Sequence, residues 1–177
     1  GQAELFVLYG RRRVGKTELL ARFCEGKRAV FYVSDLGSEV SLRTTLSNAV
    51  NAVVFGAEQM DAVYASWEAL FQALGRAAQD ERLIVVLDEF PYLVSAHPPL
   101  ASTLQKVWDQ TLKQTQLMLV LCGSYIGMME ETVLAYQAPL YGRRTGQYLL
   151  EPLAFQDARM FVPDYGPEDQ VRAYAVY

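Results

Sequence analysis

The sequence predicts an α/β protein with three layers, in which helices cover both faces of a parallel sheet. Short and almost wholly apolar runs, typical of strands buried on both faces, alternate with stretches whose apolar residues recur at spacings of three and four. The first strand, helix and second strand together span about thirty residues, the length of a βαβ unit. Such a unit implies parallel strands joined by a right-handed crossover.

Length, composition and charge further restrict the class of protein. The 177 residues suit one domain with a sizeable core, and a hydrophobic fraction of 51% argues against disorder. The formal net charge of −4 gives no basic footprint of the kind that dominates nucleic-acid affinity. The apolar runs reach only strand length, and residues 1–4 do not resemble a signal peptide. We therefore expect a cytoplasmic protein without a membrane partner, which could meet nucleic acid only through domains outside this sequence.

The first strand is expected at 5–9, and a phosphate-binding loop follows it. Gly10, Gly15, Lys16 and Thr17 fill the four fixed positions of G-x-x-x-x-G-K-[ST]. Gly10 lets the chain leave the strand in a tight turn, and Gly15 lets the backbone come close to a phosphate. An ordinary glycine turn between a strand and a helix is the alternative interpretation.

A helix is expected to begin near Lys16, and its free amides and dipole favour an anion at that end. Lys16 is expected to neutralise the β and γ phosphates of a nucleotide, and the Thr17 hydroxyl to bind Mg²⁺. The residues expected to bind the nucleotide are Gly10, Arg11, Arg12, Arg13, Val14, Gly15, Lys16, Thr17 and Glu18.

A second buried strand is predicted at 29–33, which completes the βαβ unit. Ser38 or Ser41 could cap the next helix, whose apolar face runs from Leu42 to Val53. Gly56 would end this helix, and a link of mixed polarity would lead to a further helix after Ser66, with apolar residues facing the sheet.

The strongest strand pattern covers 83–87 and ends in Asp88 and Glu89. Ligands bind at the carboxyl ends of parallel strands, so two carboxylates there suit the second half of a nucleotide hydrolase site. Asp88 would hold Mg²⁺, directly or through water, and Glu89 would orient and polarise the attacking water. Without the phosphate loop, the same pair would more simply mark the start of a solvated loop.

The pattern continues with a turn at Pro91, an amphipathic helix over 100–112 and a buried strand over 117–122. Ser124 follows that strand, so its hydroxyl could sense the γ phosphate or the attacking water. A plain Gly-Ser turn is an equally good interpretation. A short helix is expected over 126–133.

Arg143 and Arg144 precede a fifth predicted strand at 147–150. A guanidinium group matches phosphate through its planar fork of donors, and an arginine near the γ phosphate stabilises transition-state charge. An exposed basic turn that pairs with carboxylates is the alternative. Helical segments are expected at 155–162 and from residue 167 onward.

Together these segments resemble the archaeal-type ATPases on the STAND and AAA+ side of the P-loop superfamily, which also occur widely in bacteria. The segments that carry the resemblance are Tyr-Gly-Arg-Arg-Arg-Val-Gly-Lys-Thr at 9–17, Leu-Asp-Glu-Phe-Pro-Tyr-Leu at 87–93, Leu-Cys-Gly-Ser at 121–124 and Leu-Tyr-Gly-Arg-Arg-Thr at 140–145. The resemblance implies a five-stranded parallel sheet in the order 5-1-4-3-2 and the use of ATP and Mg²⁺. It also implies an ATPase core over 1–152, with the beginning of a truncated helical lid over 153–177.

The resemblance further implies roles for single residues. Ser124 would take the sensor position, and Arg143 or Arg144 the arginine position before the fifth strand. The catalytic set would then be Glu89, Lys16, Ser124, Arg143 and Arg144, with Thr17 and Asp88 at the metal.

Two functions fit this set. The first is Mg²⁺-dependent ATP hydrolysis that drives or gates a conformational change, with an arginine supplied by a neighbouring subunit of a homo-oligomer as one arrangement. The second is a slow switch or scaffold that signals ADP or ATP to C-terminal domains absent here. A GTPase is disfavoured because the sequence has no Asn-Lys-x-Asp motif, and a small-molecule kinase because Glu89 follows the metal aspartate.

Overall fold

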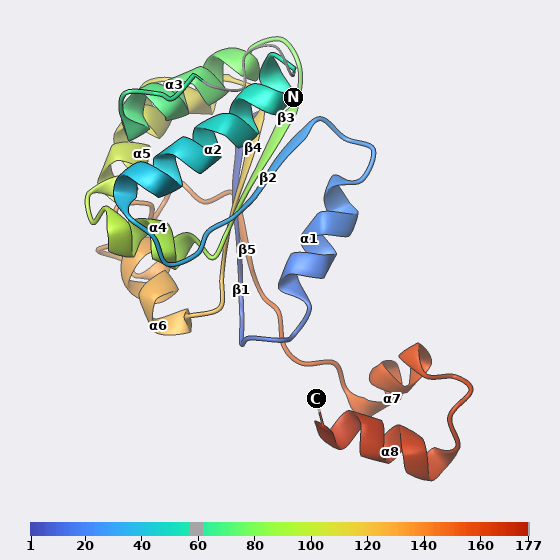
Figure 1. Cartoon of the computed structure of the whole chain (residues 1–177). Coiled ribbons are helices and arrows are strands. Elements are labelled where there is room, and N and C mark those ends of the chain that lie inside the picture. The colour runs from blue at the N-terminus through green and yellow to red at the C-terminus, as the bar shows by residue number, and fades with distance from the viewer. Residues whose placement is uncertain (57–61, 177) are drawn as a thin grey trace.

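The computed structural model describes residues 1–56 and 62–176, and a five-stranded sheet with parallel pairing forms its centre (Figure 1). The strands are β1 (Glu4–Tyr9), β2 (Ala29–Val33), β3 (Leu83–Asp88), β4 (Leu117–Gly123) and β5 (Gly146–Leu149). Their order is β2-β3-β4-β1-β5, and every neighbouring pair is parallel. The predicted order 5-1-4-3-2 is this same order viewed from the other edge, so the fold prediction is confirmed.

Helices lie on both faces of the sheet. On one face lies α1 (Lys16–Cys24), whereas the opposite face carries α2 (Glu39–Val54), α3 (Trp67–Ala77), α4 (Phe90–Ala96), α5 (Leu100–Gln110) and α6 (Ile126–Met129) (Figure 1). Two short turns, η2 (Leu112–Gln114) and the π-helical η3 (Glu130–Leu134), extend α5 and α6. The C-terminal segments are α7 (Phe155–Ala158), η4 (Arg159–Phe161) and α8 (Pro167–Val176).

The interior strand β3 shows why apolar and polar residues do not alternate in the strand sequences. All six of its residues are buried. Val85 and Leu87 pack in the large core under α2, α3 and α5, while Ile84 and Val86 pack in the smaller core beneath α1. Successive side chains of a strand point to opposite faces, so a strand covered on both faces needs apolar residues at every position.

Serine caps start two of the helices on the larger core. The Ser38 side chain accepts a hydrogen bond from the Ser41 amide at 3.2 Å, and the Ser66 side chain accepts one from the Ala69 amide at 3.1 Å. Each cap satisfies a donor that has no partner within its helix. The link between Gly56 and Ser66 lies partly outside the described residues.

The turn expected at Pro91 is wrong. Pro91 is buried in the first turn of α4, which begins directly after Glu89. Proline is tolerated there because its missing N–H would have had no intrahelical partner, and its fixed φ suits a helix start. The segment between β3 and α5 is short, so its sequence pattern did not indicate a separate helix.

The C-terminal segments follow β5 at the end of the sheet from which the loop after β1 emerges (Figure 1). The rings of Phe155 and Tyr174 pack edge to face with centroids 5.4 Å apart, and the Tyr174 hydroxyl donates to the Leu153 carbonyl at 3.1 Å. The assignment of residues 153–177 to a lid stays a prediction, and Tyr177 lies outside the described residues. No helix within residues 1–56 and 62–176 has both the length and the apolar character needed to cross a membrane.

Gly123→Ala should destabilise the fold. A Cβ at Gly123 would lie 2.7 Å from the Met129 sulfur and 2.9 Å from Pro91 Cδ, and the proline ring cannot rotate away. We expect a loss of about 1–3 kcal/mol in the free energy of unfolding, measured by urea denaturation. Gly166→Ala is the matched control, because a Cβ there meets no atom within 4 Å. Equal denaturation midpoints for the two variants would contradict this account.

Candidate functional site

The predicted phosphate loop, the acidic pair and Ser124 lie together where three adjacent strands end. In the parallel register Tyr9 pairs with Gly123, and Leu87 pairs with Leu121. The loop after β1, the acidic pair after β3 and Ser124 after β4 therefore share one edge of the sheet. This edge holds the carboxyl ends of the strands, where open α/β sheets bind their ligands.

The backbone of residues 10–15 forms a turn of the kind that binds anions. Arg13 and Gly15 have positive φ values of 66° and 92°, and Gly15 directly precedes α1. Within the described part of the chain, the backbone amides of residues 11–15 donate no hydrogen bond. Free amides in such a turn, next to a helix N-terminus, are the usual cradle for phosphate. Gly10 is required because a Cβ there would collide with the Leu150 carbonyl oxygen.

Lys16 is held inside this loop. Its side chain is only 5% exposed, and Nζ donates to the carbonyl oxygens of Gly10 at 2.9 Å and Arg11 at 2.7 Å. An ammonium group carries three donors, so two bonds to the loop leave one for a phosphate oxygen. The lysine thus supports the loop and also presents a positive charge to it.

Thr17 and Asp88 form the oxygen pair expected at a metal. The Thr17 hydroxyl donates to Asp88 Oδ2 at 2.6 Å, and Asp88 is 1% exposed. The other carboxylate oxygen, Oδ1, accepts from the Glu89 amide at 2.9 Å. Oxygen ligands suit Mg²⁺, which is usually bound by one or two protein groups together with substrate phosphates. The donor set therefore fits the predicted metal.

Ser34 was missed by sequence reasoning. It follows β2, is 3% exposed, and its hydroxyl donates to the Asp88 carbonyl oxygen at 2.7 Å. The Ser34 amide donates to the same oxygen at 2.9 Å. A hydroxyl residue at the end of the strand next to β3 was the available signal.

Glu89 is the second residue of the acidic pair, and its backbone has a left-handed conformation with φ of 52°. Its Oε2 accepts a hydrogen bond from the Ser124 amide at 3.2 Å, so the structure brings these two predicted residues together. Arg12 reaches the same place: Nε donates to Ser124 Oγ at 3.4 Å and Nη2 to the Tyr92 hydroxyl at 2.9 Å. Tyr92 had no predicted role, although it lies only three residues after Glu89.

Cys122 lies beneath this edge, fully buried. Burial, followed by the nearby charge of Asp88, raises the pKa of its thiol. The thiol therefore stays protonated and acts as a small apolar group.

The structure does not bring Arg143 and Arg144 to the loop. Both precede β5, whose first residue pairs with Phe6, so they lie toward the opposite end of the strands from the loop. Arg143 forms a two-pronged ion pair with Asp109 of α5, with Nη2 to Oδ2 at 2.7 Å and Nε to Oδ1 at 3.2 Å. Arg144 donates to the Leu134 carbonyl and stacks on the Tyr141 ring.

Glu18 points along α1, away from the loop. It forms an exposed ion pair with Arg22 at 3.0 Å. Arg11 and Arg13 are exposed and Val14 is half-buried, all within the phosphate turn.

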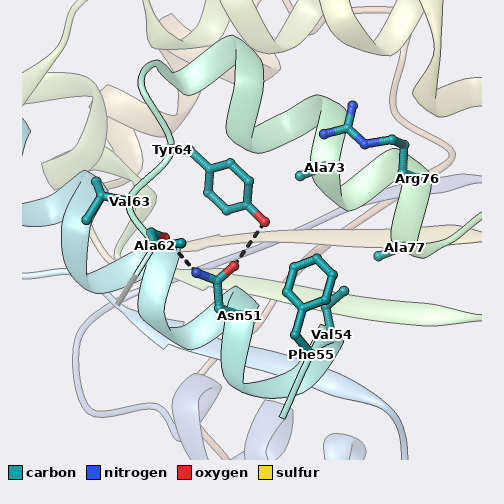
Figure 2. A pocket seen from close by; sticks show the side chains of 9 residues that line it. All are labelled: Asn51, Val54, Phe55, Ala62, Val63, Tyr64, Ala73, Arg76 and Ala77. Carbon is teal, nitrogen blue, oxygen red and sulfur yellow. Dashed lines mark hydrogen bonds between the residues drawn. The ribbon is translucent and has the colours of Figure 1, made fainter. Parts of the chain in front are cut away.

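A separate pocket of about 430 Å³ lies between the C-terminal half of α2 and α3. Figure 2 shows Tyr64 pointing at Asn51, whose Oδ1 accepts from the tyrosine hydroxyl at 3.0 Å, with Phe55 and Arg76 also lining the space. This pocket lies on the face opposite α1 and at the amino ends of the strands, so it is distinct from the phosphate loop.

The glycine loop, the buried lysine and the paired Thr17 and Asp88 are features of the P-loop NTPase class. The chain belongs to the family described as ATPase domains predominantly from Archaea, whose profile matches residues 1–171. An uncharacterized protein of Methanocaldococcus jannaschii is 35% identical over 171 residues, which is 97% of this chain. The chain spans 36% of that relative.

Solved structures share the fold. The Walker-type ATPase PABY2304 of Pyrococcus abyssi has a TM-score of 0.63 at 20% identity, covering 93% of this chain and 55% of that one. The ORC2 protein of Aeropyrum pernix, solved as ADPNP–ADP complexes, has a TM-score of 0.62 at 14% identity, covering 90% and 45%. The chain thus spans about half the length of these neighbours.

Asp109→Asn should lower stability at neutral pH. Its hydrogen bonds with Arg143 hold the pKa of the Asp109 carboxyl below its ordinary 3.8. A carboxylate with a depressed folded pKa stabilises the fold above its unfolded pKa, and this stability is lost as pH falls through the folded value. The side chain is 42% exposed, so we expect at most about 1 kcal/mol at pH 7.

Urea denaturation at a series of pH values measures this difference, which should close at pH values below 3.8. Asp169→Asn, which removes an ion pair whose side chains are 62% and 76% exposed, is the control and should change stability little. A difference between wild type and Asp109→Asn that persists unchanged in acid would show that the ion pair is not its source.

Proposed function

We propose that this domain binds ATP with Mg²⁺ and hydrolyses it. The observation that carries the proposal is the 2.6 Å hydrogen bond between Thr17 and Asp88, which joins the phosphate loop to the acidic pair. It puts an anion-binding turn, two oxygen ligands and the Glu89 carboxylate at one edge of the sheet. A loop that only bound phosphate would have no need of the second carboxylate.

The roles of the residues follow from their positions. Lys16 and the free loop amides neutralise the β and γ phosphates. Glu89 accepts a proton from water as the water oxygen bonds to the γ phosphorus, and the bond from that phosphorus to the β–γ bridging oxygen breaks to release ADP. When bound at Thr17 and Asp88, Mg²⁺ would neutralise charge on the phosphate oxygens.

Ser124 positions Glu89 in this scheme. Its amide holds Oε2 of the glutamate, and its hydroxyl faces Arg12. This arrangement supports the sensor role expected for Ser124, because a residue that contacts both Glu89 and Arg12 can respond to a ligand bound between them.

The alternative is a slow nucleotide switch with negligible turnover. One observation favours it: Arg143 is engaged by Asp109, and Arg144 by Leu134 and Gln147, so neither supplies charge to the loop of its own chain. Under the ATPase proposal, a second copy in a homo-oligomer would present one of them. Under the switch proposal, nucleotide state would be passed to the polypeptide outside this sequence through the proposed lid at 153–177.

The setting proposed for either function is the cytoplasm, where ATP is available. DNA belongs to this proposal only through polypeptide outside the sequence. The ORC1 protein of Aeropyrum pernix, a neighbour at 17% identity, was solved in complex with DNA. The net charge of −4 gives the present chain no general electrostatic attraction to DNA.

Glu89→Gln distinguishes the two functions. Glutamine keeps an oxygen for the Ser124 amide but cannot accept the proton of water at neutral pH. If the domain is an ATPase, steady-state phosphate release should fall by about 100-fold or more while ATP affinity is kept. Glu25→Gln, an exposed change at the far end of α1, is the control. Equal release by wild type and Glu89→Gln, with both binding ATP, would favour the switch.

Lys16→Ala tests the binding site itself. Removal of a charged donor to phosphate should weaken ATP and ADP binding by roughly tenfold to 100-fold, given about 1.5–3 kcal/mol for a hydrogen bond to a charged group. Isothermal titration calorimetry measures both affinities. Lys27→Ala, an exposed lysine just beyond α1, is the matched control and should bind like wild type. Unchanged affinity in Lys16→Ala would remove the assignment of the loop as the nucleotide site.

A further inference from the structure

Three consecutive arginines, Arg11 to Arg13, occupy the variable positions of the phosphate loop. Of these three arginines, only Arg12 has a side chain that forms hydrogen bonds with other described elements. Its partners are the hydroxyls of Ser124 after β4 and Tyr92 in α4. The arginine therefore leaves its own loop and points across the edge toward the acidic pair.

The contacts of Arg12 form a short chain that ends at Glu89. The guanidinium Nε donates to Ser124 Oγ at 3.4 Å, and the amide of the same serine donates to Glu89 Oε2 at 3.2 Å. Ser124 thus links the guanidinium to the Glu89 carboxylate, which would hold the attacking water. A γ phosphate has to lie between that water and Lys16, so Arg12 borders the same space.

The partners of Arg12 also determine how readily it can change them. Both acceptors are neutral hydroxyl groups, whereas a phosphate oxygen is ionised and forms a hydrogen bond roughly twice as strong. Arg12 is exposed, so its movement breaks no buried packing. Arg143, in contrast, would have to leave a carboxylate that it holds through two donors. Of these two arginines, Arg12 is therefore the better suited to take up a phosphate.

We propose that Arg12 is a catalytic arginine supplied by the chain that binds the nucleotide, and that Tyr92 is its positioning residue. Arg12 exchanges its long contact with Ser124 for the γ phosphate of ATP, keeps the Tyr92 hydroxyl through Nη2, and stabilises the charge that develops on the phosphate. Tyr92 holds the guanidinium at the carboxyl edge of the sheet, so that the arginine loses little conformational entropy when the nucleotide binds. This inference rests on the proposed function, since it requires a γ phosphate in the loop.

Arg12→Gln and Arg12→Lys test the contact with the γ phosphate. In the full chain we expect Arg12→Gln to lower kcat by about 100-fold or more, the usual cost of losing a charge-stabilising donor. Its affinity for a non-hydrolysable ATP analogue should fall about tenfold, while ADP affinity changes less than twofold. Arg12→Lys should recover part of the analogue affinity because it keeps the charge but not the fork of donors.

Tyr92→Phe tests the positioning role. It removes only the hydroxyl, so we expect kcat to fall about threefold to tenfold with ADP affinity unchanged. Added to Arg12→Gln, it should have no further effect, because its influence passes through the arginine. Tyr125→Phe is the matched control: this tyrosine adjoins Ser124, is 66% exposed, and its hydroxyl forms no hydrogen bond with the described residues.

The results that would overturn the inference differ from those that would overturn the proposed function. Equal losses of ADP and ATP-analogue affinity in Arg12→Gln would show that the arginine only supports the loop. An unchanged ratio of ATP-analogue affinity to ADP affinity would show that Arg12 does not contact the γ phosphate. This measurement does not require hydrolysis. An effect of Tyr92→Phe that persists in the Arg12→Gln background would remove the positioning role. Failure of wild type to bind either nucleotide would overturn the proposed function and the inference together.

Discussion

The hydrogen bond between Thr17 and Asp88 depends on the order of the strands. Thr17 follows β1 and Asp88 ends β3, yet these strands are not neighbours, because β4 lies between them. The loop must therefore pass over the end of β4 to bring the hydroxyl to the carboxylate. At the end of β4, Cys122 is buried beneath this edge, and Gly123 leaves its side-chain space to Pro91 and Met129. The site therefore depends on the order in which the strands are connected.

Most of the fold could be predicted from the sequence because it rests on local patterns. Doubly covered strands require continuous apolar runs, and the glycine spacing of the loop requires a strand before it and a helix after it. Ser38 could be recognised as one of two candidate caps, because a cap acts within three residues. The helix around Pro91 could not, since the proline suits both a turn and a first helical turn, and burial in the core decides between them.

The candidate site was predictable only in part, for a related reason. The loop and the acidic pair are contiguous motifs. The partners of the arginines are set by tertiary structure: Arg12 meets Tyr92 across 80 positions, and Arg143 meets Asp109 across 34. No local pattern distinguishes an arginine beside a hydroxyl from one beside a carboxylate. That difference nevertheless decides which guanidinium is free to bind phosphate.

The close approach of Gly10 and Leu150 has a mechanical consequence. The Leu150 amide donates to the Tyr9 carbonyl at 2.7 Å, and the Leu150 carbonyl fills the space where a Cβ on Gly10 would lie. Leu150 is also the residue that leaves β5 toward α7 and α8. A displacement of the phosphate loop must therefore carry the base of the C-terminal helices with it, because close-packed backbone has no slack to absorb the movement. The glycine that begins the loop is thus also the point of contact between the loop and the segment that follows β5.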